Sequence, residues 1–148
     1  ITKFLASDSI DGEVNIYQAL KSSNVVTLLH CCKLNNFGRD KINDLPWSTD
    51  SGLLGVSCNY GTRIFKAYDS YIDEVDKFDE GDVCGISFHP FHNHVLASGS
   101  SRTGAIILRN VVRDGDGYSI LCFIPSKENL NLNCICCQSV SCSVYSIN

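Results

Sequence analysis

The sequence predicts an all-β fold of antiparallel strands. Its apolar segments are four to seven residues long and are bounded by Gly, Asp, Asn or Ser, which is typical of strands that alternate with tight turns. Helical periodicity is nearly absent, because the best candidate, residues 17–28, is rich in β-branched residues that favour a strand. One pattern also occurs three times along the 148 residues, and repeats of this kind are typical of stacked sheets.

The repeated pattern is a strand of small residues, a tight turn that contains glycine, and a β-branched strand. Its three copies are FLASDSIDGEVNIY (4–17), LLGVSCNYGTRIFKA (53–67) and VLASGSSRTGAIILR (95–109). Each copy has a leucine at the same place in its first strand, namely Leu5, Leu54 and Leu96. Glycine accepts the backbone angles of a tight turn, so we expect hairpin turns at Asp11-Gly12, Tyr60-Gly61 and Thr103-Gly104.

An upstream element extends two of the copies into longer units. INDLPWSTDSG (42–52) and VCGISFHPFHNH (83–94) are each a strand that ends in an aromatic and a polar residue. The segment ISFHPFHNHVLASGSSRTGAIILRNV (86–111) resembles the WD-repeat family of β-propellers, whose units read roughly strand, W/F-S/H-P, turn, LASGS-D-G and strand. The resemblance covers about residues 1–125. It implies antiparallel four-stranded blades of a partial β-propeller, acting as a non-catalytic protein–protein interaction scaffold.

The resemblance divides residues 1–125 into about three blades. The family's Gly-His and Trp-Asp pairs are missing, so we expect apolar contacts to hold the blades together in place of the buried Asp-His-Ser-Trp network that those pairs build. Residues 126–148 match the pattern poorly, and they are expected either to start another blade or to be a non-native end. The expected strands are 4–9, 14–18 and 24–31, then 42–47, 53–58, 62–67 and 72–78, then 83–88, 95–100, 105–109 and 118–124.

Three blades cannot close a ring, since propellers have about four to eight. The chain also contains no methionine. We therefore expect it to be a fragment of a larger propeller protein, which needs the missing repeats or self-association to cover its open faces.

Nine cysteines are many for a chain of this length. Their number is odd and no N-x-[ST] glycosylation signal occurs, so we interpret them as reduced, buried thiols of an intracellular protein, cytoplasmic or nuclear. A secreted disulfide scaffold is the alternative interpretation. The last four cysteines lack the C-x2-C spacing of a structural zinc site, which disfavours a metal there. They are Cys134, Cys136, Cys137 and Cys142.

Three histidines within six residues, His89, His92 and His94, are the basis of an alternative function. Imidazoles bind zinc or copper, so the cluster could serve a metal-dependent enzyme. The residues fall on an expected turn, however, and no fourth ligand is apparent, so we interpret them as turn histidines. The sequence contains no other catalytic or cofactor-binding motif, and we predict no catalytic residue, no metal and no cofactor.

The net charge of −4 disfavours nucleic acid as a partner, and no apolar stretch is long enough for a membrane-spanning helix. The acidic residues are concentrated in residues 69–82, which contain seven of them and one lysine. This acidic segment is either a solvated outer strand whose charges protect its edge, or a surface for a basic segment of another protein.

In the WD-repeat family, the turns between the second and third strands share one face with the loops between blades. The resemblance therefore implies a partner-binding surface on that face. Tyr60 would supply a rigid aromatic contact to a protein partner, and three acidic residues would give the rim a negative potential. The expected surface residues are Asn59, Tyr60, Asp79, Glu80, Asp82 and Arg102.

Overall fold

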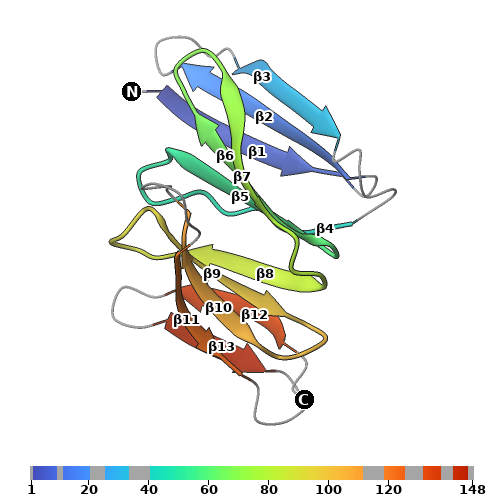
Figure 1. Ribbon diagram of the computed structural model, residues 1–148. Coiled ribbons are helices and arrows are strands. Elements are labelled where there is room, and N and C mark those ends of the chain that lie inside the picture. The colour runs from blue at the N-terminus through green and yellow to red at the C-terminus, as the bar shows by residue number, and fades with distance from the viewer. Residues whose placement is uncertain are drawn as a thin grey trace.

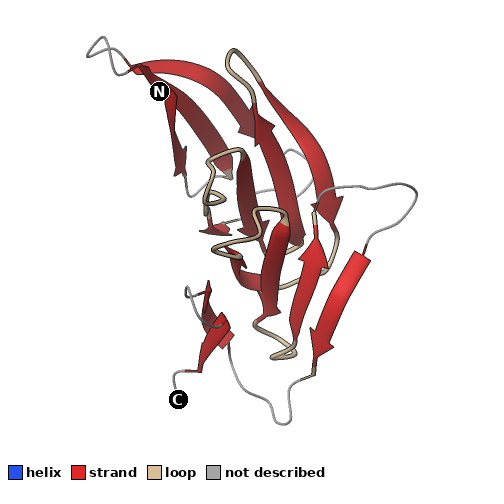
Figure 2. Ribbon diagram, turned by 90° about the vertical axis from the view of Figure 1, so that its left-hand side faces the viewer, coloured by secondary structure: helices blue, strands red, loops and turns tan. Residues whose placement is uncertain are grey.

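The computed structural model describes seven stretches of the chain and confirms the all-β fold. These stretches are residues 2–9, 12–20, 26–33, 41–111, 119–125, 132–137 and 142–146. Within them the chain forms strands and no helix, and the antiparallel sheets are stacked on one another (Figure 1, Figure 2). The described residues accordingly include no helix that is long and apolar enough to cross a membrane.

Three sheets follow one another along the chain, and each pairs its strands in sequence order (Figure 1). Sheet one contains β1 (Thr2–Asp8), β2 (Glu13–Leu20) and β3 (Val26–Lys33). Sheet two contains β4 (Ile42–Asp44), β5 (Leu53–Cys58), β6 (Gly61–Ala67) and β7 (Ile72–Phe78). Sheet three contains β8 (Val83–Phe88), β9 (Val95–Ser100), β10 (Ile106–Asn110) and β11 (Ser119–Ile124). A hairpin follows, in which β12 contacts β8 and β9; it consists of β12 (Leu132–Cys137) and β13 (Cys142–Ser146).

The strands lie where the repeat predicts them, within a few residues, with one clear exception. The strand predicted for 42–47 ends at Asp44, and Trp47 forms only an isolated bridge to β5. Pro46 explains the early end, because proline has no N–H to donate to the ladder. Its carbonyl still accepts a hydrogen bond from Gly55 N at 2.9 Å, so the chain stays beside β5 after the strand has ended.

The pairing register confirms that each copy of the repeated pattern is an antiparallel hairpin. Each aligned leucine pairs across its hairpin, Leu5 with Tyr17, Leu54 with Phe65 and Leu96 with Arg109, although the turns differ in length. Asp11 lies outside the described residues, but all three turn glycines have positive φ angles, as the turns require. These angles are 78° at Gly12, 152° at Gly61 and 64° at Gly104.

Apolar side chains fill the two spaces between the three sheets. Between sheets one and two, Val14 and Ile16 of β2 pack against side chains from β5 and β6, which include Leu54 and Phe65. Sheet two uses its other face against sheet three, so every residue of β5 is buried. The core between sheets two and three consists of Leu53, Ile64, Phe78, Val83, Ile86, Phe88, Leu96 and Val111.

The three aligned leucines differ in burial although they occupy the same place in their sheets. Leu54 and Leu96 are 0% exposed, because the preceding sheet covers the face on which they lie. Leu5 is 53% exposed, since no described sheet precedes sheet one. Val26 and Leu28 of β3 share that face and are exposed as well. We name Leu5, Val26 and Leu28 the open face of sheet one.

Candidate protein-interaction surface

Three connections from sheets two and three meet at one end of the strands and form a rim. They are the β5–β6 turn with Asn59 and Tyr60, the β7–β8 loop with residues 79–82, and the β9–β10 turn with Ser101 and Arg102. Because successive strands are antiparallel, these connections all lie at the same end of the sheets. We name these eight residues the turn rim.

Backbone hydrogen bonds tie the three connections together. Gly81 N donates to Tyr60 O at 3.2 Å, and Asp82 N donates to Asn59 O. On the other side of the loop, Ser101 N donates to Asp82 O at 2.9 Å. The β7–β8 loop is thus held between two hairpin turns, and the rim is a preformed surface.

The rim presents an aromatic ring and a mixed set of charges. Tyr60 is 50% exposed, and Asp79 is exposed beside it in the rim. Arg102 Nε and Asp82 Oδ2 form a surface ion pair of 2.9 Å, which reduces the negative potential that the sequence predicts there. The structure therefore brings together five of the six predicted surface residues, with a weaker net charge than expected.

Glu80 is the sixth residue, and its predicted place on the negative rim is wrong. Its side chain is only 15% exposed and points to the interior, where Oε1 lies 2.8 Å from Arg109 Nη2 of β10. Ser98 Oγ of β9 donates a hydrogen bond to the other carboxylate oxygen at 2.8 Å. The Glu80 carboxylate therefore neutralises a buried cation and does not face a partner.

Arg109 completes this buried polar network. The guanidinium carbon lies 4.2 Å from the centre of the Phe78 ring, which adds a cation–π contact. Burial lowers the pKa of Arg109 and raises the pKa of Glu80, while the attraction between the two charges opposes both changes. Apolar contacts hold the sheets together as predicted, and this buried ion pair with its cation–π contact adds a polar component that the sequence analysis did not predict. Arg109 could have indicated this network from the sequence, because it is the lone charge in the apolar segment AIILRN. An arginine buried in such a segment needs a partner of opposite charge.

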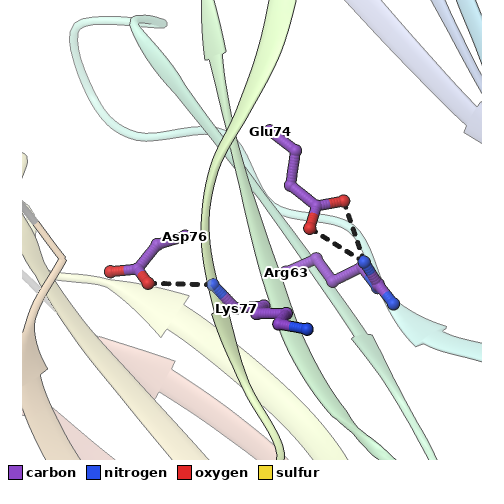
Figure 3. Close-up of polar contacts among 4 residues, drawn as sticks. All are labelled: Arg63, Glu74, Asp76 and Lys77. Atoms are coloured by element: carbon purple, nitrogen blue, oxygen red, sulfur yellow. Dashed lines mark hydrogen bonds and ion pairs between the residues drawn. The ribbon is translucent and has the colours of Figure 1, made fainter.

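The acidic segment is only partly a charged surface. Arg63 Nη1 of β6 donates to both carboxylate oxygens of Glu74 of β7, at 2.8 and 2.9 Å (Figure 3). Asp76 is buried, and its carboxylate accepts a hydrogen bond from Lys77 N at 2.9 Å. In the part of the chain that the structure describes, Asp79 is thus the rim carboxylate that is exposed and outside an ion pair.

The three histidines of the alternative metal site lie at the opposite end of the strands, in the β8–β9 loop. His89 Nδ1 accepts hydrogen bonds from the backbone N of Phe91 and of His92, both at 3.1 Å, so this imidazole supports the turn. The ring centres of His92 and His94 are 6.1 Å apart. Among the described residues, no group of three or more His, Cys, Asp or Glu side chains is placed to hold a metal ion.

The structure describes the side chains of three cysteines. Cys58 is buried, and the partly buried thiol of Cys84 donates to Gly99 O at 3.3 Å. Cys122 in β11 is exposed, so the prediction of buried thiols is wrong for this residue. The side chains of the four C-terminal cysteines lie outside the described residues.

A groove of 560 Å³ lies beside the histidine loop, between sheets two and three. Lys66 and Tyr68 form one wall, with the ammonium 5.3 Å from the centre of the ring. Asp50 borders the groove, but its carboxylate stabilises the turn in which it lies. Asp50 Oδ1 accepts hydrogen bonds from Ser48 Oγ at 2.6 Å and from Gly52 N at 3.0 Å. The hydrogen bond from Ser48 is the largest cause of a lowered pKa at Asp50.

The lowered pKa of Asp50 predicts a loss of stability in acid. A carboxyl whose pKa is lower in the folded state stabilises the fold above its ordinary pKa of about 4, and this contribution disappears as the pH falls through the folded value. We expect the free energy of unfolding of Asp50→Asn to fall less than that of the wild type between about pH 5 and pH 2. Urea titrations at a series of pH values measure this difference, and parallel curves for the two proteins would contradict it.

Comparison with solved structures supports the propeller-like fold. A protein of Bacteroides uniformis that is named provisionally as a 6-phosphogluconolactonase superposes with a TM-score of 0.71 over 99% of this chain and 48% of that one, at 9% identity. A Bacteroides fragilis protein with the same provisional name gives a TM-score of 0.67 over 99% and 39%, at 15% identity. The β-propeller domain of Cps50 (Swd1) from Myceliophteria thermophila gives 0.58 over 80% and 35%, at 20% identity.

These similarities define the class of fold. The chain is an all-β protein with propeller-like stacking of antiparallel sheets, and it spans less than half the length of each of these neighbours. No family model matches the sequence, and no curated protein matches it.

Proposed function

We propose that this chain is a non-catalytic protein-interaction module of a β-propeller and that it binds its partner through the turn rim. The observation that supports this most directly is the set of backbone hydrogen bonds that hold the three connections in one arrangement. A surface that is already ordered loses little conformational entropy when it binds, so its contacts contribute more fully to affinity.

Tyr60 is the residue from which we expect the largest contribution. Tyrosine is enriched among the residues that dominate binding energy, because a large rigid ring covers much area with few rotatable bonds. The position of Tyr60 is defined by its carbonyl, which accepts the hydrogen bond from Gly81 N, while half of the residue stays exposed.

The chemistry of the rim favours a protein segment that carries a basic residue. Asp79 is exposed, and Asp82 balances Arg102, so one uncompensated negative charge lies beside the aromatic ring. Such a charge acts mainly on the association rate and is screened by salt. The alternative for the rest of the acidic segment, a solvated outer strand, fits the pairing of Glu74 with Arg63.

Replacing Tyr60 by alanine is expected to weaken the complex at least about tenfold, through faster dissociation. Affinity purification from cell extract with the wild type identifies the proteins to test, and surface plasmon resonance with the purified partner measures the association and dissociation rates.

Asp79→Lys should instead slow association, and only at low salt. Both variants should keep the circular dichroism spectrum and melting temperature of the wild type.

Tyr71→Ala is the matched control for Tyr60→Ala. Tyr71 is 51% exposed, but it lies in the β6–β7 turn at the other end of the strands. If Tyr71→Ala weakened the complex and Tyr60→Ala did not, the binding surface would be on the opposite face and the turn rim would be excluded.

An enzymatic assay tests the alternative that the chain is an enzyme. Two of the structural neighbours carry the name 6-phosphogluconolactonase, but identities of 9% and 15% relate them to this chain by fold alone. We expect the purified chain not to accelerate hydrolysis of 6-phosphogluconolactone. Turnover above the uncatalysed rate that is lost on His92→Ala would contradict the non-catalytic proposal.

A further inference from the structure

The groove between sheets two and three has the composition of a small-molecule site. Its volume of 560 Å³ lies within the range of about 300–1,000 Å³ that is typical of ligand pockets. Leu53, Val75 and Val111 give it an apolar lining, and Phe91, which is 68% exposed, adds an aromatic ring. Ligand pockets combine such a lining with a few polar groups that orient the ligand.

The polar groups of this groove are mainly basic. Lys66 is exposed and forms no ion pair with any residue that the structure describes, although Asp73 lies opposite to it in the register of β6 and β7. His92 and His94 add two exposed imidazoles from the β8–β9 loop. Among the described residues that line the groove, Asp50 is the acidic one, and its carboxylate accepts hydrogen bonds within its own turn. The groove therefore has one full positive charge that a ligand can neutralise.

The walls of the groove are held in place before any ligand binds. Thr49 Oγ1, in the loop before β5, donates to Pro90 O in the β8–β9 loop at 3.1 Å, which joins the loops of the two sheets. The ring of Tyr68 holds the ammonium of Lys66 at 5.3 Å through a cation–π contact. Because these groups are already ordered, they lose little conformational entropy when a ligand binds.

We propose that the groove binds a small organic monocarboxylate whose body is aromatic or branched and apolar. The carboxylate would pair with the Lys66 ammonium and accept a hydrogen bond from the N–H of His92 or His94. The apolar body would cover Leu53 and Val111. A single carboxylate matches the single full positive charge, whereas a dianion would bring an unbalanced charge close to acidic side chains.

This site is separate from the turn rim. It lies at the other end of the strands, and sheets two and three supply both of its walls, so it needs no further repeat to be complete. A failure of the test below would therefore leave the function proposed for the rim unaffected.

Three probes separate the contribution of charge from that of apolar contact. Naphthoate has the carboxylate and an aromatic body, naphthamide has the same shape without the charge, and acetate has the charge without the body. Two-dimensional amide NMR of the full 148-residue chain follows each titration. We expect naphthoate to shift signals of the β8–β9 loop with a Kd of about 1 mM or lower. Naphthamide should bind at least about tenfold more weakly, since it lacks the charge-assisted hydrogen bonds, and acetate should bind more weakly still.

Lys66→Gln tests the residue to which the proposal assigns the carboxylate. It should weaken naphthoate binding about tenfold and leave naphthamide binding unchanged. Lys77→Gln is the matched control, because it removes an equal charge from an exposed position of β7 outside the groove. It should change neither affinity. Both lysines are exposed, so both variants should keep the circular dichroism spectrum of the wild type.

Four results would overturn the proposal. They are a naphthoate titration that does not saturate, equal affinities for naphthoate and naphthamide, an equal effect of the two lysine substitutions, and signal shifts confined to β11 or to the open face of sheet one. The last result would show that the aromatic body adheres to exposed apolar side chains outside the groove.

Discussion

Arg109→Met is expected to lower the free energy of unfolding by about 3–5 kcal/mol. The guanidinium is 8% exposed and pairs with Glu80 at 2.8 Å, so its removal leaves a carboxylate that is largely buried and has no counter-charge. The hydrogen bond from Ser98 remains, but a neutral hydroxyl cannot replace a cation. Urea unfolding followed by tryptophan fluorescence and circular dichroism measures the change.

The double variant Glu80→Leu/Arg109→Met distinguishes a broken ion pair from lost packing. Replacing both charges of a buried pair by apolar groups is often close to neutral. We therefore expect the double variant to be more stable than Arg109→Met alone by about 2 kcal/mol or more. If the two single effects were additive, the network would contribute nothing as a pair, and packing of Arg109 on Phe78 would explain the loss.

Gly61→Ala is expected to cost about 3 kcal/mol, at the upper end of the range for overpacking. A Cβ atom at this position would lie 1.9 Å from the carbonyl oxygen of Phe78 and 3.2 Å from the Cα atom of Asp79. Both atoms belong to the backbone, so relief of the clash requires the β7–β8 loop to move. Because this loop is bonded to Tyr60 O, the variant should also weaken partner binding.

Gly81→Ala is the control for this substitution. Gly81 has a φ angle of 65°, but a Cβ atom there would meet no other atom within 4 Å. It should therefore cost only the backbone strain, about 1–2 kcal/mol. Thermal and urea unfolding measure the free energy of unfolding of both variants. Equal losses of this free energy would show that the backbone angle of Gly61, rather than its close contact with Phe78, makes glycine necessary there.

Local features of the sequence were sufficient to predict most of the strands and the glycine turns, with the early end of β4 as the exception. Alternation of apolar residues and the position of each glycine depend on a few neighbouring residues, so the hairpins around Gly61 and Gly104 could be recognised without knowing the rest of the fold. The grouping of Asn59, Tyr60, Asp82 and Arg102 was predicted from the resemblance to the WD-repeat family, and the antiparallel order of the strands explains why these turns lie at one end.

Burial and charge pairing could not be derived in the same way. Leu5 carries the same local pattern as Leu54 and Leu96, yet it is exposed, because burial depends on whether a second sheet covers that face. Glu80 belongs by sequence to the acidic segment, but it pairs with Arg109, which is distant along the chain and comes close only when β8, β9 and β10 pair. Periodicity shows which side a residue faces, whereas only packed neighbours determine what that side meets.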